Sequence, residues 1–560
     1  MELVFFLKIF SYLILFFIIL LGIAKVISIF INYLPKLHSE LFALRSKLVK
    51  KKYQHWFYAY ERFNKTPTIF GKRYFKLNNY LFRIGKQNNK INKKISQIII
   101  VLYSKSSKYF NYLFNNTPYS RPIDNKSVNF FKIQVPKNKS FKFKTNNDDI
   151  VLKTFYINKS PKRKLVLILL FDGLSNYFSK QLTNSNRFFG KSNKLENMWS
   201  NSAWTLPTWS NLITGMYTSN HLNYEPRSFY NSNPKFEKLS SSVKSKSTIF
   251  EFFKKNNFIT ASYSPYVRIN PTYNFDRGVD IMKFCENEST DEIVDNIISH
   301  IEMFNNSSNF IVAHMMDLHH VSKGFKRITD YSNFPEENYN YNQELKKERV
   351  SNRLNKRDEF VKDKSFYEEQ DLHGIIKSSD LRLKNLYNYL SDKKFEDYTI
   401  LLLGDHGTRL KKFNEQKNIL SEYHQNVGLF IKDKKIKSFA SKKNKLIETI
   451  DIFPSLVARY SNNLKNISKK QFDGQNTIFS NTKKDYHLAE SIYTSEYNLL
   501  INCNNNYSYS SYEFNKDKIK KKINTKFYNN KHKRMILNKE DKLFKKLDTI
   551  EKKHLKKSKI

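Results

Sequence analysis

The run LVLILLF at Leu165–Phe171 decides the fold of this chain, because it is an unbroken apolar segment between the basic stretch PKRK and the pair Asp172-Gly173. A strand with one solvated face alternates apolar and polar residues, whereas a strand buried on both faces of a parallel sheet forms a continuous apolar run. We therefore predict that Leu165–Phe171 is a central strand of a parallel sheet and that Asp172 lies at its carboxyl end.

The segments that follow this run alternate between helix and strand patterns. The predicted helices are Thr248–Asn256, Asp291–Phe304, Asp380–Leu390 and Leu446–Tyr460, and the predicted strands are Phe258–Tyr263, Asn309–His314, Tyr398–Leu403 and Val427–Ile431. Such alternation predicts an α/β fold in which helices sandwich a mostly parallel sheet.

The composition excludes several classes of protein. With 40% apolar and 15% aromatic residues, the 560-residue chain is too apolar to be disordered. Its two cysteines, Cys285 and Cys503, are too few for a disulfide framework, and they do not form the C-x-x-C pair of a zinc ribbon or a redox motif.

The net charge has two explanations. The chain has 97 Lys and Arg against 51 Asp and Glu, a formal charge of +46, and the basic residues run from Lys36 to Lys559. This is either a general enrichment in Lys, Asn, Ile, Phe and Tyr, as a genome poor in G and C would impose, or a means of attraction to anionic lipid or glycan. Nucleic acid is not expected as a partner, because the sequence has no zinc finger and no aromatic-flanked RNA motif.

An apolar segment near the amino terminus predicts one transmembrane helix that precedes the α/β fold. Ile9–Ala24 is uncharged and lies between Lys8 and Lys25, and apolar residues continue to Leu34. A helix over this region is long enough to cross a hydrocarbon core of about 30 Å. A cleaved signal peptide is the alternative, but no A-x-A-like site precedes Pro35. We expect a single-pass membrane protein, with the side of the membrane left open because basic residues throughout the chain dilute the positive-inside rule.

These patterns divide the chain into four parts. They are residues 1–35 as the anchor, 36–162 as a basic juxtamembrane or linker region, 163–480 as the α/β catalytic domain, and 481–560 as a C-terminal subdomain with a basic tail. Within the second part, Gln97–Tyr103 and Asn129–Val135 are strand-like. From about Asn502 the chain is polar and very basic, so we expect a solvated helix or tail that rests on anionic headgroups.

Polar residues collect where three of the predicted strands end. They are Asp172 after the first, His314, Asp317, His319 and His320 around the end of the second, and Asp405 and His406 after the third. In an open α/β sheet, ligands bind at the carboxyl ends of the strands. Carboxylates and imidazoles together suit a divalent metal, zinc or manganese especially. An Asp-Gly pair after one strand is usually just a turn, so the prediction depends on the three strand ends together.

A short helix is predicted directly after Thr205. Pro207 suits its first turn, Thr205 its cap position and Gly215 its exit. The amino end of a helix favours an anion through its free N–H groups and its dipole. A hydroxyl placed there and touching a metal can be deprotonated and attack phosphorus. The alternative is that Thr205 is merely an N-cap.

These residues resemble the alkaline phosphatase superfamily, and within it the sulfatase-like hydrolases and transferases. The sulfatase pattern C-x-P-S-R followed by L-x-T-G is similar to Thr205–Trp209 and Leu212–Gly215, S-D-H-G is similar to Gly404–Gly407, and H-x-x-D-x-H is similar to His314–His319. Shorter counterparts are Phe275–Gly278 for FDRG, Thr449–Leu456 for DxxPTL and Asp473-Gly474 for DG. The resemblance covers about Lys164 to Ser480, with the motifs in the family's order.

The resemblance implies an alkaline-phosphatase/sulfatase-like fold and a set of roles. Asp172, Thr205, Asp405 and His406 would hold one divalent metal (zinc, manganese, magnesium or calcium), with Thr205 as a nucleophile that is transiently esterified. His314, Asp317, His319 and His320 would line the substrate anion or bind a second metal, and His424 would contribute from the carboxyl side. Each of these residues also has an ordinary alternative as a core or surface residue.

Departures from the sulfatase pattern indicate the reaction. Sulfatases need a Cys or Ser that is oxidised to formylglycine, and Thr205 cannot yield that aldehyde. Trp209 stands where the sulfatases have Arg, and Gly173 stands in place of a second metal-binding Asp. Threonine is instead the nucleophile of the family's phosphodiesterases and of its phosphoethanolamine and phosphoglycerol transferases. The resemblance therefore implies an enzyme acting on phosphoesters, and the apolar segment Ile9–Ala24 predicts that it is membrane-anchored, with an envelope lipid or glycan among its candidate substrates.

Two other functions stay open at this point. The degenerate positions Gly173 and Trp209 allow a catalytically silent family member that binds acidic glycan or lipid through its basic surface. A true sulfuric-ester hydrolase is the third reading, disfavoured by Thr205.

Overall fold

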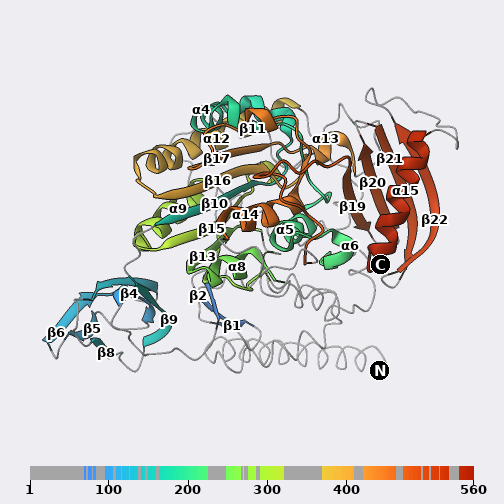
Figure 1. The fold of residues 1–560 in the computed structure, drawn as a ribbon. Coiled ribbons are helices and arrows are strands. Elements are labelled where there is room, and N and C mark those ends of the chain that lie inside the picture. Colours follow the sequence, from blue (N-terminus) through green and yellow to red (C-terminus); the bar gives the residue numbers. More distant parts are fainter. Residues whose placement is uncertain are drawn as a thin grey trace, which may run out of the picture. The chain divides into compact units, whose positions relative to one another are not determined.

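The described residues of the computed structural model fall into two compact units, one within Met1–Lys159 and one within Ser160–Ile560 (Figure 1). They are residues 68–70, 74–77, 80–83, 95–104, 109–114, 117–124, 127–135, 141–144, 149–158, 163–224, 247–266, 269, 275–285, 290–320, 369–408, 420–461, 471–493, 496–503, 506–515, 518–528 and 542–560. The predicted anchor segment Ile9–Ala24 lies outside them. In the described part of the chain, no helix has the length and apolar character needed to span a bilayer.

The first unit is built from short antiparallel strands. β1 (Thr68–Phe70), β2 (Tyr74–Leu77) and β3 (Tyr80–Arg83) pair in sequence order. One sheet has the order β7-β4-β9 (Ser127–Gln134, Ile95–Ser104, Asp149–Asn158) and another the order β6-β5-β8 (Thr117–Pro122, Tyr109–Phe114, Phe141–Lys144). Apolar side chains of β4, with Phe110 and Phe131, form the core of this unit. The two strand-like runs of the sequence fall in β4 and β7.

The central sheet of the second unit is mixed. Its strands lie in the order β14-β13-β15-β10-β16-β17-β11. These are Ile281–Phe284, Phe258–Ser264, Ser308–Met315, Lys164–Phe171, Asp397–Gly404, Leu429–Asp433 and Lys194–Leu195. The strands from β14 to β16 pair in parallel, whereas β17 is antiparallel to both of its neighbours. The expected mostly parallel sheet is thus a parallel core with an antiparallel strand beside it.

The predicted central strand occupies the middle of this sheet as β10. Every residue of β10 from Leu165 to Phe171 is buried, and β15 and β16 flank it in parallel. Burial on both faces explains the continuous apolar run, because no side of these strands reaches water.

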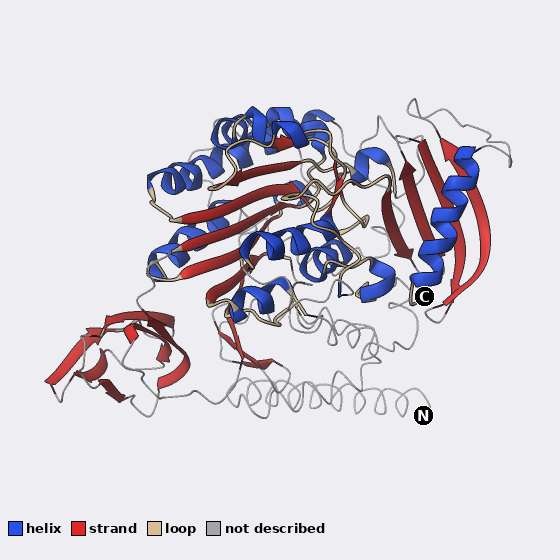
Figure 2. Ribbon diagram, in the orientation of Figure 1, coloured by secondary structure: helices blue, strands red, loops and turns tan. Residues whose placement is uncertain are grey.

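Two groups of helices flank the sheet (Figure 2). One group is α4 (Thr183–Phe189), α9 (Thr290–Met303) and α12 (Glu369–Asp392), and the other is α5 (Thr205–Thr214), α8 (Ile249–Lys255) and α14 (Ile452–Tyr460). The predicted helix at Thr248 begins with a capping box, in which the Thr248 side chain accepts from the backbone N–H of Glu251 while the Glu251 carboxylate accepts from the backbone N–H of Thr248.

The prediction of one helix over Leu446–Tyr460 is wrong in its first half. The chain there forms β18 (Ile447–Glu448), which pairs with β12 (Met198–Trp199), and then a single 3₁₀ turn, η10 (Thr449–Asp451), before α14 begins. The physical reason is that Glu448 and Asp451 are fully buried acids held by Lys484. Their side chains fix the backbone in a conformation that apolar periodicity does not reveal.

The expectation of a solvated helix or tail from about Asn502 is right only in part, because the helix at the carboxyl end has an exposed lysine face but its other face packs on a sheet. Strands β19 (His487–Tyr493), β20 (Glu496–Cys503), β21 (Asn506–Asn515) and β22 (Lys518–Tyr528) form an antiparallel sheet, and α15 (Lys542–Lys557) packs on it (Figure 1). Leu547 and Ile550 of α15 are buried among side chains of β20. Alternating Ser and Tyr in β21 and the many lysines of α15 concealed this amphipathic arrangement in the sequence.

Candidate active site

Strand register brings two distant acidic residues together. Phe171 at the end of β10 pairs with Gly404 at the end of β16, so Asp172 and Asp405 leave the sheet side by side. The backbone N–H of Asp405 donates to the Phe171 carbonyl at 3.0 Å, which holds the two strand ends together. The predicted meeting of these strand ends is therefore present in the structure.

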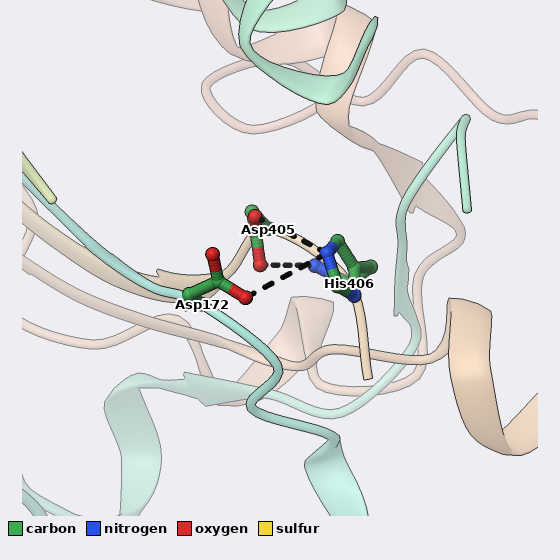
Figure 3. A group of neighbouring side chains, drawn as sticks. All are labelled: Asp172, Asp405 and His406. Atoms are coloured by element: carbon green, nitrogen blue, oxygen red, sulfur yellow. Dashed lines mark hydrogen bonds and ion pairs between the residues drawn. The ribbon is translucent and has the colours of Figure 1, made fainter. Parts of the chain in front are cut away.

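Asp172, Asp405 and His406 form one compact group (Figure 3). His406 Nε2 lies 3.5 Å from Asp405 Oδ2 and 3.8 Å from Asp172 Oδ1. One ligand atom from each residue falls within 4.8 Å of the others, and both carboxylates are buried. Two carboxylates and an imidazole this close need a cation or a shared proton to balance their charge.

Thr205 completes the group from helix α5. Its Oγ1 donates to Asp172 Oδ2 at 3.0 Å and lies 3.5 Å from His406 Nε2. The structure corrects one detail, because Trp204 is the N-cap and Thr205 is the first helical residue. The Thr205 hydroxyl is therefore not used in capping and faces the carboxylates. Gly215 ends the helix in a left-handed conformation, as the sequence predicted.

The geometry fits a divalent cation. The ligands of a four-coordinate ion with bonds of about 2.0–2.2 Å lie roughly 3.3–3.6 Å apart. Four separations that involve Thr205 Oγ1 or His406 Nε2 run from 3.0 to 3.8 Å, and one atom each of Asp172, Asp405 and His406 lies within 4.8 Å of the others. Among the described residues, the buried Asp405 Oδ2 has no hydrogen-bond partner. A buried carboxylate oxygen without a donor is costly unless a metal or proton binds it.

The other atoms of these ligands are fixed by the backbone. Asp405 Oδ1 accepts from the N–H of Gly173 at 3.0 Å and from the N–H of His406 at 2.7 Å, which leaves Oδ2 to face the cluster. His406 Nδ1 lies 2.9 Å from the Gly407 carbonyl. Because a carbonyl only accepts, Nδ1 donates there and Nε2 keeps its lone pair, the form that a metal ligand requires.

His314 lies on another side of the same two carboxylates. Its Nε2 is 3.6 Å from Asp172 Oδ2 and 3.9 Å from Asp405 Oδ2, and its Nδ1 is 3.2 Å from the Ser264 hydroxyl. Burial lowers the pKa of His314 to about 4, against the opposing effect of Asp405, so the ring is neutral at pH 7. The structure thus places His314 at the predicted metal group, although the sequence left open whether it serves a substrate or a second metal.

The remaining predicted site residues lie in two short helical segments, η5 (Asp317–His320) and α13 (Glu422–Gln425). Asp317 accepts from the hydroxyl of Thr290 and lies 3.5 Å from Arg382, so it ties η5 to α9 and α12. His319 and His320 close η5, and their side chains lie outside the described structure. His424, in α13, lies against His406 with ring centroids 5.1 Å apart and the ring planes tilted by 40°.

Sequence reasoning missed Ser264 and the segment that positions Thr205. Ser264 is the last residue of β13, one position beyond the predicted strand, and a polar residue at a strand end was the available signal. Asn201 donates to Glu448 and to the Leu488 carbonyl, while its own carbonyl accepts from the Glu490 N–H. Strand β19 of the C-terminal subdomain therefore braces the chain just before Thr205, and no local pattern predicts that contact.

Gly173 is required at its position by both conformation and space. Its φ is +77°, and a Cβ there would meet the Thr408 Oγ1 at 2.5 Å. That hydroxyl donates to the Gly173 carbonyl at 2.5 Å, so it cannot move without losing a buried hydrogen bond. A carboxylate side chain, as in the sulfatase pattern, does not fit at this position in the present structure.

We expect Gly173→Ala to destabilise the protein more than Gly190→Ala does. Gly190 has a similar φ of +84°, but a Cβ added there would meet no described atom within 4 Å. With ψ of 147°, Gly190 lies in a region that is open essentially to glycine, so Gly190→Ala should cost only conformational strain of about 1–3 kcal/mol. Gly173→Ala should add an overpacking cost of about 1–3 kcal/mol. Urea unfolding of both variants measures the difference, and equal losses would contradict the steric argument.

The resemblance to the sulfatases is supported by a match to a protein-family model. Residues 191–460 match the family model described as Sulfatase. No curated protein sequence matches the chain.

Several solved structures are similar to this chain at low identity. A protein of the alkaline phosphatase superfamily from Vibrio parahaemolyticus is 15% identical, with a TM-score of 0.44 over 68% of this chain and 85% of that one. A putative sulfatase from Bacteroides thetaiotaomicron is 11% identical, with a TM-score of 0.46 over 70% and 92% of the two chains. The periplasmic domain of a phosphoethanolamine transferase from Campylobacter jejuni is 12% identical, with a TM-score of 0.35 over 53% and 89%.

Proposed function

From the premise that residues 191–460 form a sulfatase-family domain, we propose that this chain is a metal-dependent hydrolase or transferase that attacks phosphoesters with Thr205. The observation that carries the proposal is the placement of the Thr205 hydroxyl against Asp172 within the Asp172–Asp405–His406 group. A nucleophilic hydroxyl needs a group that accepts its proton and a cation that stabilises the resulting negative charge. In our proposal Asp172 accepts the proton, and the Asp172–Asp405–His406 group holds the cation.

The residue type at position 205 selects phosphoesters over sulfuric esters. Oxidation of a threonine side chain gives a ketone and not the aldehyde on which formylglycine chemistry depends, so Thr205 can act only as an alcohol. An alcohol that displaces a group from phosphorus forms a phosphothreonine, which a second in-line displacement resolves. The acceptor in that step is water in a hydrolase and an alcohol in a transferase.

Protein side chains can accept the proton of the Thr205 hydroxyl and can hold a cation beside the substrate. Thr205 Oγ1 forms a bond to phosphorus as the ester oxygen leaves, and its proton passes to Asp172 Oδ2, which already accepts it as a hydrogen bond at 3.0 Å. Asp172, Asp405, His406 and Thr205 are the residues that would hold a divalent ion. When bound, such an ion polarises the phosphoryl oxygen and lowers the pKa of the attacking hydroxyl.

The first turn of α5 favours an anion beside Thr205. Trp204 caps the helix without a side-chain hydrogen bond, Pro207 has no N–H, and the Thr208 N–H donates to the Trp204 carbonyl. The N–H groups of Thr205 and Leu206 are therefore the ones that can bind an anion. The helix dipole adds a partial positive charge at the same end. Substrate oxygens are expected to lie there, and the ring of His424 lies beside that of His406.

Sulfuric-ester hydrolysis is the second candidate, favoured by the family whose model the chain matches. We expect the purified full chain, supplied with manganese or zinc, to release nitrophenol from bis-nitrophenyl phosphate with a higher kcat/KM than from nitrophenyl sulfate. Acid-quenched protein should carry a nitrophenyl phosphate group on Thr205, seen by mass spectrometry, because only one of the two nitrophenyl groups leaves in the first displacement. Faster turnover of the sulfate would overturn the phosphoester proposal.

The same experiment addresses a silent binding protein. A chain that turns over neither ester and retains no divalent ion after dialysis would be a glycan- or lipid-binding family member. A membrane location through Ile9–Ala24, and an envelope lipid or glycan as the natural substrate, are further parts of our proposal.

A further inference from the structure

The outward face of α15 is a stripe of lysines. Every exposed position of this helix except Thr549 is a lysine, namely Lys542, Lys545, Lys546, Lys552, Lys553, Lys556 and Lys557. Their spacing of three and four residues aligns them along one side of the helix. The helix has 16 residues, so this α15 lysine stripe is about 24 Å long.

The stripe is held rigidly against the domain that carries Thr205. On the inner face of α15, His554 Nε2 lies 2.7 Å from Glu490 Oε1, and the Glu490 carboxylate also accepts from the Ser219 N–H at 2.8 Å. Glu551 Oε2 accepts from the Ser510 hydroxyl at 3.0 Å. Because these polar contacts are buried, α15 cannot roll to turn its lysines elsewhere.

The lysines of the stripe are poorly neutralised. Within the described part of the chain, Lys552 is the one member with an ion-pair partner, Asp548 at 2.7 Å. The net charge of the whole chain does not explain this concentration, since the exposed face of α9 consists of Asp291, Asp295 and Ser299. Positive and negative faces are thus segregated on one unit, and the stripe is a specific surface.

A cavity beside the stripe favours an extended negatively charged surface as the partner, and not a small anion. The cavity, of about 360 Å³, is lined by Lys553 and Lys557 but also by Glu448, Asp473 and Asp485. Lys483 and Lys484 line the cavity too, and Lys484 is engaged by Glu448 and Asp451, so the cavity wall has mixed charge and does not select a small anion. The outward stripe presents positive charge alone, which suits an extended negative surface.

We propose that the α15 lysine stripe docks the domain against an anionic phospholipid surface. Lysine is a compact, strongly hydrated point charge that suits the diffuse field of lipid headgroups, whereas nucleic-acid recognition favours arginine and stacking aromatics, and the stripe has neither. The contact would fix the orientation of the active site relative to the membrane. This inference depends on α15 alone and is independent of the chemistry at Thr205.

A fluorescent label at Thr549 tests the proposal in the full chain. Thr549 is the exposed non-lysine position of the stripe, and Cys285 and Cys503 are buried, so Thr549→Cys can be labelled selectively. We expect lipid-borne nitroxide to quench this label in vesicles of phosphatidylglycerol and phosphatidylcholine but not of phosphatidylcholine alone. Quenching should disappear in roughly 1 M salt, where the screening length falls to about 3 Å. A label at Ser299→Cys on α9 should stay unquenched throughout.

Two charge-matched variants test whether the position of the lysines or the total charge of the protein determines the response to anionic lipid. The first replaces stripe lysines by glutamine (Lys545, Lys546, Lys553 and Lys556), and the second replaces exposed lysines elsewhere (Lys384, Lys434, Lys435 and Lys437). At about fivefold per lysine, four replacements in the first set should weaken the quenching response to anionic lipid by roughly 600-fold, and the second set should leave it unchanged. Equal effects of both sets, quenching by neutral vesicles, or a response of the label to duplex DNA but not to anionic vesicles would overturn the proposal.

Discussion

Thr205→Ala is expected to abolish turnover of an aryl phosphodiester while the fold is kept. Alanine removes the oxygen that would form the bond to phosphorus, and loss of a nucleophile typically lowers kcat by a factor on the order of 10⁴ or more. Thr205 Oγ1 makes a hydrogen bond to Asp172, so its removal should cost only about 0.5–1.5 kcal/mol of stability. Steady-state release of nitrophenol and thermal unfolding measure the two effects separately.

Thr214→Ala on the same helix is the matched control. The Thr214 hydroxyl also makes one buried hydrogen bond, to the Ser210 carbonyl, but it lies at the other end of α5. It should lower stability to a similar extent and leave kcat nearly intact. Thr205→Ser keeps the attacking oxygen and should retain measurable turnover. Full activity in Thr205→Ala would exclude this residue as the nucleophile.

The second large effect is expected at Asp405, where Asp405→Asn should remove the divalent metal. Asparagine keeps an oxygen for the N–H groups of Gly173 and His406, but it replaces the buried and unpartnered Oδ2 by a neutral group. The affinity for manganese or zinc should fall on the order of 100-fold or more. Metal content after dialysis, followed by titration of the apoprotein, measures this loss.

Thermal unfolding gives a second readout, because the variant should bind metal less tightly and yet, without metal, be no less stable than the wild type. Without metal, Asp405 and Asp172 repel each other, so apo Asp405→Asn should be as stable as the apo wild type or more so. Added metal should raise the Tm of the wild type but not of the variant, because ligands stabilise only the state that binds them. Asp317→Asn is the control: its carboxylate contacts Thr290 and Arg382, and it should bind metal normally. A variant Asp405→Asn that retains stoichiometric metal would refute the ligand role.

The core of the fold could be predicted because its strands are buried on both faces. Leu165–Phe171, Asn309–His314 and Tyr398–Leu403 became β10, β15 and β16 with boundaries shifted by only a residue or so. A C-terminal subdomain was predicted from residue 481, but its strands could not be located in the same way, because its elements are half polar. In α15, Leu547 and Ile550 carry the packing while lysines dominate the composition.

The sequence by itself determined the buried strands, the order of the family-like motifs and the threonine at the amino end of α5. Continuous apolar runs and residue identity are properties of the chain, and they need no knowledge of its neighbours. Only the tertiary structure decided which polar residues share a site. Strand register joins Asp172 to Asp405 and brings His314, near the end of β15, against both carboxylates. Packing of η5 against α12 turns Asp317 toward Arg382. Proximity within a few ångströms depends on contacts between segments hundreds of residues apart, which no local pattern encodes.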